Sequence, residues 1–429
     1  MKIIPSAEFD GYWKALAVRQ DDAEAAAAVS EVIAAVRSGG DAAVRRYAAR
    51  FDKASPETLE VKREAVTAAW DALRAAEPEL GAALELAANH IRSFAEAQKA
   101  QLVNFETETA PGLFTGQRVI PVERAAVYVP GGRFPLVSSV LMGVIPAITA
   151  GVGEVFLASP PAEDGLPDQR ILAAARLAGA GRVFAVGGAQ AVAALALGTE
   201  SIPRVDLIAG PGNRYVAAAK RLLFGEVGID FVAGPTDVLI IADGSAAADL
   251  IAADMLAQAE HDPDARARVL VPGREPAEII LRALEQRLAA LPTAAIARSS
   301  LDAGGLIIVY ENREDAVRIA NTIAPEHLEL QTADTEAWIP LLRNYGSLFI
   351  GALAAEVLGD YSAGINHTLP TSGSARFTGG LSVRHFLKTV TTLRCTAEPG
   401  WEAARKAAEL IARAEGLAGH AASAASRRP

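Results

Sequence analysis

Short β-branched segments alternate with alanine-rich stretches of helical periodicity through most of residues 118–350. We predict strands at residues 125–129, 154–157, 182–186, 205–209, 238–241, 268–271, 305–309 and 347–350. Strands separated by helices pair in parallel, because each crossover helix returns the chain to the same edge of the sheet. The pattern therefore predicts an α/β protein with two lobes, each an open parallel sheet with helices on both faces.

Helical segments precede and follow this alternating region. Residues 21–100 carry apolar side chains at helical spacing, and a further helix is predicted at 402–414, before a break at Gly416 and Gly419. The 429 residues are enough for two or three lobes at roughly 150 residues each. Because 51% of the residues are hydrophobic but only 6% are aromatic, we expect cores of small aliphatic side chains.

Charge and hydropathy exclude several classes of partner. A net charge of −10 without a basic stripe argues against nucleic acid. No stretch approaches the ~18 uninterrupted apolar residues of a membrane span, and the first residues lack the apolar run of a signal peptide. We therefore expect a cytoplasmic protein. The single cysteine, Cys395, excludes an internal disulfide and a thiolate zinc site.

Glycine-containing turns accompany the predicted strands at residues 129–132, 186–190, 210–213 and 234–237. Helix N-termini beyond the carboxyl ends of parallel strands present free amide groups to ligands. One such turn is more often purely structural, but Tyr128, Gln190 and Asn213 place hydrogen-bonding side chains at three of them. The dinucleotide fingerprint is absent, since the sequence from Gly179 has Phe184 in place of the third glycine.

Compact polar motifs contain four of the six histidines. Gln258 and His261 end a long apolar helix pattern three residues apart, so they share one helical face. An amide oxygen, imidazoles and a carboxylate form a nitrogen and oxygen ligand set suited to Zn²⁺ or Mn²⁺. Glutamine is an unusual ligand and a lone histidine is more often structural, so the spacing alone leaves the metal site open. Glu326 and His327 offer a carboxylate and an imidazole for proton transfer, provided that a strand entry or turn lets them converge.

Taken together, these motifs resemble those of the histidinol dehydrogenase family. The resemblance covers nearly the whole chain and is carried by residues 128–132, 138–142, 187–191, 198–200, 210–213, 219–221, 228–230, 258–261, 324–330, 366–367 and 415–416. It implies an oxidoreductase that uses zinc and two NAD⁺ in turn. The implied reaction is the four-electron oxidation of L-histidinol through L-histidinal to L-histidine, the last step of histidine biosynthesis.

The resemblance also implies a role for each matching residue. The implied ligands of one zinc per subunit are Gln258, His261, Asp360 and His420, with His420 reaching the site of the partner subunit. His327 is implied as the base that takes the alcohol proton, and Glu326 as the group that activates water. The implied NAD contacts are Tyr128, Gln190 and Asn213. The implied substrate contacts are Thr236, His367 and Glu415, together with His327 and the four zinc ligands.

The implied fold has two incomplete Rossmann-like lobes, with helical N- and C-terminal segments, in an intertwined homodimer with shared active sites. We expect an N-terminal helical segment at 1–26 and a first, discontinuous α/β domain at 27–127 and 237–381 that carries most metal and catalytic residues. The second α/β domain, with the NAD contacts, is expected at 128–236. A helical tail at 382–429 is expected to reach the partner subunit.

Three departures from the family pattern leave the substrate open. Thr236 stands where the family usually has serine, and Arg133-Phe134 follows a glycine pair where a small residue is usual. The stretch 366–381 also resembles a paralogous branch that oxidises anionic sulfonated diols, such as 2,3-dihydroxypropane-1-sulfonate to sulfolactate. An additional arginine suits an anionic substrate.

Two alternatives of another class remain. One is a zinc hydrolase, which the absence of a His-Glu-x-x-His helix disfavours. The other is a small-molecule binding scaffold that has kept the fold but not the chemistry.

Overall fold

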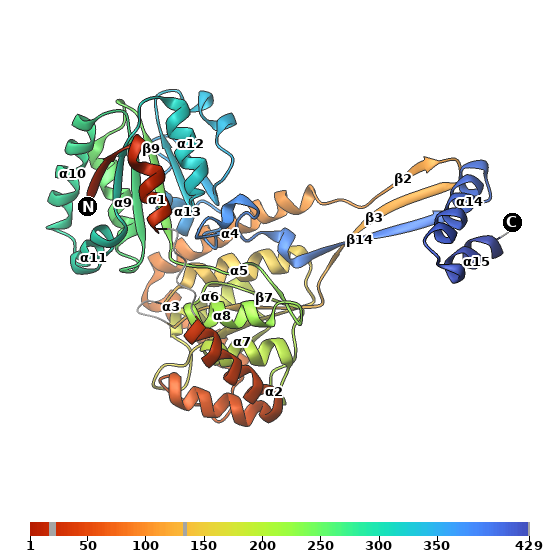
Figure 1. Ribbon diagram of the computed structural model, residues 1–429. Helices are drawn as coiled ribbons and strands as arrows, with labels where there is room; N and C mark the ends of the chain where they lie inside the picture. The colour runs from red at the N-terminus through yellow and green to blue at the C-terminus, as the bar shows by residue number, and fades with distance from the viewer. Residues whose placement is uncertain (17–22, 132–134, 428–429) are drawn as a thin grey trace.

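Two parallel sheets, each covered by helices, form the two lobes of the molecule (Figure 1). The computed structural model describes residues 1–16, 23–131 and 135–427. The six-stranded sheet has the order β1-β11-β10-β9-β12-β13. Its strands are β1 (Lys2–Pro5), β9 (Asp237–Ala242), β10 (Arg266–Val271), β11 (Leu306–Val309), β12 (His327–Gln331) and β13 (Ser347–Ile350). The helices of this lobe are α1 (Phe9–Leu16), α9 (Ala248–Ala259), α10 (Arg274–Leu288), α11 (Ala294–Gly304), α12 (Arg313–Ile323) and α13 (Glu356–Tyr361).

The five-stranded sheet has the order β6-β5-β4-β7-β8. Its strands are β4 (Arg124–Tyr128), β5 (Glu154–Ser159), β6 (Arg182–Ala185), β7 (Leu207–Ala209) and β8 (Gly228–Ile229). Helices α3 (Arg63–Ala76), α4 (Pro78–Ala100), α5 (Val137–Ala150) and α6 (Gln169–Ala178) contribute to the core on one face. Helices α2 (Ala23–Phe51), α7 (Gly188–Leu197) and α8 (Arg214–Leu223) contribute to the core on the other.

The composition of the strands explains this layered architecture. Val238, Leu239, Ile240 and Ile241 of β9 are all fully buried, because helices cover both faces of the sheet. Continuous apolar strands of this kind are typical of parallel sheets in α/β proteins. The predicted fold class, two open parallel-sheet lobes with helical ends, is confirmed.

The helices group differently from the expected domains. Helices α2, α3 and α4, from the expected segment 27–127, pack mainly on the five-stranded sheet, although Nδ1 of His90 on α4 also lies 2.7 Å from the backbone oxygen of Ser362. Strand β1, within the expected helical segment 1–26, pairs with β11 of the six-stranded sheet. Both differences have the same cause. An apolar face on a helix or strand predicts that the element is buried, but it does not predict which sheet the element packs on.

A third, antiparallel sheet is a feature that the sequence analysis missed. It has the order β14-β3-β2, with β2 (Phe105–Ala110), β3 (Leu113–Pro121) and β14 (Leu387–Cys395). Figure 1 shows this ribbon leading away from both lobes and carrying α14 (Pro399–Ala414) and α15 (Ala418–Ser426) at its far end. The expected helical tail is therefore a strand followed by two helices. None of the described helices is long and apolar enough to cross a membrane.

Candidate active site and cofactor cavity

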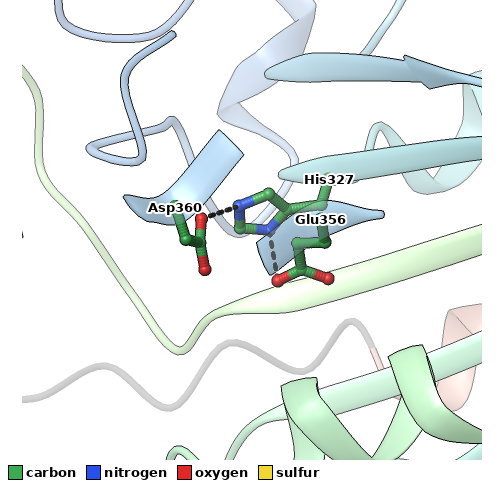
Figure 2. A group of neighbouring side chains, drawn as sticks. All are labelled: His327, Glu356 and Asp360. Atoms are coloured by element: carbon green, nitrogen blue, oxygen red, sulfur yellow. Dashed lines mark ion pairs between the residues drawn. The ribbon is translucent and has the colours of Figure 1, made fainter. Parts of the chain in front are cut away.

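His327 lies at the centre of the candidate active site, as the first residue of β12. Its ring is buried, with Nδ1 3.5 Å from Oε1 of Glu356 and Nε2 3.5 Å from Oδ1 of Asp360 (Figure 2). Burial by itself lowers the pKa of His327, but the carboxylates of Glu356, Glu326 and Asp360 outweigh burial and raise it well above its usual value. The acidic surroundings therefore stabilise the imidazolium form of His327.

Glu326 precedes β12 and faces the start of β9. Its Oε2 accepts hydrogen bonds from Thr236 Oγ1 at 2.5 Å and from the backbone N–H of Asp237 at 3.0 Å. In return, Asp237 Oδ1 accepts from the backbone N–H of Glu326 at 3.1 Å, and the buried guanidinium of Arg268 lies 3.3 Å from Asp237 Oδ2. Burial raises the pKa of Glu326 to about 7, which suits a general base near neutral pH.

The location of this pair explains how consecutive residues converge on one site. Glu326 directly precedes β12 and His327 is its first residue, so the pair stands at the entry to this strand. Thr236 and Asp237 likewise stand at the entry to β9. The turn at 234–237 thus precedes a strand, and the active site lies at the amino edge of the six-stranded sheet. This is the opposite edge from the one expected for ligands of an open parallel sheet.

Three of the proposed zinc ligands come from segments that end at this edge. Gln258 is fully buried near the end of α9, and its side-chain amide lies 2.7 Å from Thr236 Oγ1. When the amide nitrogen faces Glu356, it donates to Glu356 Oε1 at 2.5 Å and the amide oxygen faces Thr236. Burial would raise the pKa of Asp360, but interactions with His327, His367 and His261 outweigh it and lower this pKa. His261, although exposed, is therefore close enough to Asp360 to act on it electrostatically.

The residues present fit a divalent cation. The ligand atoms of His327, Glu356 and Asp360 lie within 4.8 Å of one another. Within the described part of the chain, buried His327 Nε2, Glu356 Oε2 and Asp360 Oδ1 have no hydrogen-bond partner. Buried polar atoms without partners are costly, and a cation bound at Asp360 would satisfy its Oδ1 and lie close to the other two.

His367 joins the two lobes beside this cluster. Its Nδ1 lies 3.0 Å from the backbone oxygen of Asp360, and its Nε2 lies 2.9 Å from Oγ of Ser139 on α5. Burial lowers the pKa of His367 and favours the neutral ring. The neighbouring Asn366 donates to the backbone oxygen of Met142 at 2.6 Å, so the segment that carries His367 is fixed to the second lobe.

Two predicted site residues do not reach this cluster within one chain. Glu415 follows α14 and His420 lies on α15, and both side chains are exposed. In Figure 1 these helices lie at the far end of the antiparallel ribbon, away from β12 and α13. Arg133 lies outside the described residues.

A cavity of about 860 Å³ brings together the three predicted NAD contacts, Tyr128, Gln190 and Asn213. The hydroxyl of Tyr128 accepts from the backbone N–H of Gly188 at 3.0 Å, at the first turn of α7. Asn213 caps α8, with Oδ1 accepting from the backbone N–H groups of Tyr215 and Val216. The cavity is in the size range of small-molecule sites and lies at the carboxyl edge of its sheet, as the turns predicted.

The sequence analysis missed four residues of these sites: Glu356, Asp237, Ser139 and Asp52. Glu356 and Asp360 are four residues apart on α13, and this spacing places both carboxylates on one helical face. That signal was available in the sequence. Asp52 and Ser139 carry no comparable signal, because their positions depend on how α2 and α5 pack.

The fold and the sites define a two-lobed α/β protein with a buried acid–imidazole cluster, suited to a divalent cation, and a separate ligand cavity. Comparison with known proteins gives the family. Residues 17–428 match the model of the histidinol dehydrogenase family, and the chain belongs to this family.

Similar proteins have names that agree with this assignment. The histidinol dehydrogenases of Methylococcus capsulatus and Pseudomonas aeruginosa are 46% and 47% identical to this chain over 399 residues, covering 92% of it and 90% and 89% of their own lengths. The crystal structure of histidinol dehydrogenase from Elizabethkingia anophelis superposes with a TM-score of 0.91 at 35% identity, covering 99% of this chain and 96% of that one.

Proposed function

We propose that this chain catalyses the NAD- and zinc-dependent oxidation of L-histidinol through L-histidinal to L-histidine, the last step of histidine biosynthesis. The observation that carries the proposal is the buried imidazole of His327 between carboxylates, in a chain of this family. Since such biosynthesis uses soluble cofactors, we also propose a cytoplasmic location.

We assign zinc to Gln258, His261, Asp360 and the partner subunit's His420. When bound, zinc would supply positive charge that orients the alcohol oxygen, eases loss of its proton and offsets the carboxylate charge that keeps His327 protonated. The proposed dimer supports this ligand set, because His420 lies far from the cluster of its own chain. The partner subunit's Glu415 is then a further substrate contact.

In the first oxidation, neutral His327 accepts the hydroxyl proton while the carbon-bound hydrogen leaves as hydride to NAD⁺. In the second, Glu326 accepts a proton from the water that attacks the aldehyde. His327 returns its proton to the aldehyde oxygen as the hydrate forms, and the hydrate then loses a hydride to a second NAD⁺ and a proton to the neutral His327, which gives the carboxylic acid. Thr236 and Asp237 position Glu326 through their hydrogen bonds to its Oε2. His367 and Thr236 are proposed to contact the substrate.

The test is NADH formation with L-histidinol and with 2,3-dihydroxypropane-1-sulfonate, assayed side by side. We expect about two NADH per histidinol, no turnover after treatment with a strong chelator, and recovery when Zn²⁺ is added. All the curated relatives described above are histidinol dehydrogenases, which supports histidinol over the sulfonated diol. Faster turnover of the diol would contradict the substrate, and turnover without NAD⁺ would contradict the reaction class.

A further inference from the structure

One carboxylate in the cofactor cavity has no part in the proposed reaction. Asp52 directly follows α2 and lines the cavity together with Tyr128, Gln190 and Asn213. Its Oδ2 accepts from the backbone N–H of Gly187 at 3.2 Å and from Nε2 of Gln190 at 3.3 Å. Asp52 is therefore hydrogen-bonded directly to Gln190, one of the three proposed NAD contacts.

The backbone at Gly187 allows this close approach. A Cβ atom at residue 187 would lie 2.7 Å from Oδ1 of Asp52 and 2.4 Å from Cγ of Pro160, both too short for a side chain. Both hydrogen bonds to Asp52 use Oδ2, and within the described residues Oδ1 has no hydrogen bond or ion pair. One carboxylate oxygen thus holds the turn, and the other keeps its accepting capacity beside the cavity.

The position of α2 determines which part of a dinucleotide can reach Asp52. Figure 1 shows α2 on the side of the five-stranded sheet that is remote from α13, which bears Asp360 of the active site. The nicotinamide must approach the substrate beside His327, so the α2 end of the cavity receives the adenosine half. The surroundings of Asp52 suit this half.

Aromatic and cationic side chains lie next to Asp52 in the cavity lining. Tyr47 and Phe51 stack with their centroids 6.0 Å apart, and Phe51 remains 58% exposed. The Arg50 guanidinium lies 4.9 Å from the centroid of the Phe51 ring, and aromatic and guanidinium groups together offer a surface on which a base can stack. Arg50 and Lys53 also line the cavity and offer positive charge for a diphosphate.

Two other acids line the cavity, and neither is placed like Asp52. Asp168 caps α6 by accepting from the backbone N–H of Arg170 at 2.8 Å. Glu31 is an exposed side chain on α2. A carboxylate accepts hydrogen bonds from ribose hydroxyls, whereas it repels a 2′-phosphate.

We propose that Asp52 accepts a hydrogen bond from the adenosine ribose of NAD and thereby makes this site select NAD over its 2′-phosphorylated form. This inference rests on the proposed use of NAD as cofactor. It adds a residue that determines which cofactor is bound.

The test measures direct binding, by calorimetry on the zinc-loaded protein, of NAD⁺, NADP⁺ and NAD⁺ that lacks the adenosine 2′-hydroxyl. The proteins are the wild type, Asp52→Asn and Glu31→Gln, a control that removes a charge from the same cavity. We expect the wild type and Glu31→Gln to bind NAD⁺ roughly 10-fold or more tightly than the 2′-deoxy form, since the lost bond involves a charged acceptor. Asp52→Asn should bind the two within about 2-fold and should gain relative affinity for NADP⁺.

Two outcomes overturn the inference while leaving the proposed function intact. One is equal binding of NAD⁺ and its 2′-deoxy form by the wild type, a result that needs no variant to fold. The other is an equal weakening of both by Asp52→Asn, which would show that Asp52 only holds Gln190 and the glycine turn. Failure of the wild type to bind any of the three cofactors would contradict the proposed function itself.

Discussion

At the scale of single residues, the unusual feature of the active site is the number of acids around one imidazole. Glu326, Glu356 and Asp360 all lie within 4 Å of the ring nitrogens of His327 by their nearest oxygens, at 3.8, 3.5 and 3.5 Å. A base must be neutral to accept a proton, yet these charges favour the imidazolium. A positive charge bound beside Asp360 would offset these carboxylates and favour the neutral ring.

Replacement of His327 by asparagine tests its assignment as base. Asparagine keeps a polar side chain but cannot accept the alcohol proton, so we expect the first oxidation to slow by roughly 10²–10⁴-fold. Zinc content, measured by elemental analysis, and NAD⁺ affinity should stay near those of the wild type. A comparable loss of zinc in His327→Asn would show that His327 is a ligand instead.

The residues of the site differ in how well sequence reasoning can find them. The motif at residues 326–327 predicts a carboxylate and an imidazole, and the structure brings both to one edge of the sheet. Glu356 is harder to find, because the buried environment that matters to it is created by α9 and β12, far away in the sequence. Chemistry at one position can be predicted from residue type, but electrostatic surroundings depend on packing.

At the scale of elements, a pair of buried carboxyls joins the segments that carry the site. Asp254 on α9 and Glu329 on β12 each accept a hydrogen bond from Gln331 Nε2, at 3.0 and 2.8 Å. The other oxygen of Glu329 accepts from the backbone N–H of Glu356 at the start of α13. Burial raises the pKa of both carboxyls, and the charge of Asp254 raises that of Glu329 further, so the pair favours one shared proton at the junction of α9, β12 and α13.

This shared proton makes stability depend on pH. Burial, followed by the charge of Asp254, raises the pKa of Glu329 to about 8 from 4.5. As pH rises through this window, the unfolded chain loses the proton first, so the free energy of unfolding falls between about pH 4.5 and 8. Glu329→Gln should remove this part of the dependence, and its stability relative to the wild type should be higher at pH 8 than at pH 5.

Urea unfolding at the two pH values measures this difference. Asp249→Asn is the control, because Asp249 lies on the same helix in an exposed ion pair with Arg287 and its pKa is lowered by that partner. The contribution of Asp249 to the free energy of unfolding changes only in acid, below the pH window of about 4.5 to 8. An unchanged pH dependence in Glu329→Gln would show that the Glu329 carboxyl is not the source.

A buried ion pair supports the loop that carries Asn213. Lys220 on α8 pairs with Asp230 and donates to the backbone oxygen of Gly210 at 3.0 Å, while Asp230 accepts from the backbone N–H of Gly210 at 2.8 Å. We expect Lys220→Met to cost roughly 3–5 kcal/mol of unfolding free energy, because Asp230 would remain buried without its cationic partner. NAD⁺ affinity should also fall, since the loop loses its anchor.

Thermal and urea unfolding check this prediction. The adjacent, exposed Arg221 provides a matched control, and Arg221→Met should change stability by less than about 0.5 kcal/mol. A similar small effect of Lys220→Met would mean that the pair contributes nothing net.

Elements differ in how far periodicity predicts them. Eight of the eleven strands in the two parallel sheets were predicted, because burial on two faces selects continuous apolar runs, whereas β1, β8 and β12 were missed. Strand β2, with the sequence FETETA, is exposed along most of its length, and β14 is rich in threonine and also largely exposed. Neither has an apolar face, so alternation of hydrophobic residues could not reveal the antiparallel ribbon.

At the scale of the whole molecule, the ribbon and its terminal helices leave apolar side chains uncovered. Leu393 on β14 and Leu410 on α14 are each 68% exposed, and Ile411 is 58% exposed. Exposed apolar groups that are gathered on one projecting segment mark an interaction surface. Helical periodicity in residues 399–414 predicts a helix but not where the ribbon carries it. A second copy of this chain, receiving His420 at its own cluster, would account for both the exposure and the missing ligand.

Mixing two inactive variants tests this assembly. His420→Ala and Asp360→Ala should each abolish turnover, because each lacks one zinc ligand at every site. When the two variants are unfolded together and refolded, about half of the dimers contain both chains, and one of the two sites in each such dimer has all its ligands. Activity should therefore recover to about a quarter of the wild-type value, with zinc content rising in parallel.

Two further mixtures serve as controls. His420→Ala mixed with His261→Ala should recover to the same extent. Asp360→Ala mixed with His261→Ala should stay inactive, because every site then lacks one of the ligands that its own chain supplies. Recovery in that last mixture, or none in the first two, would contradict a ligand supplied by the partner.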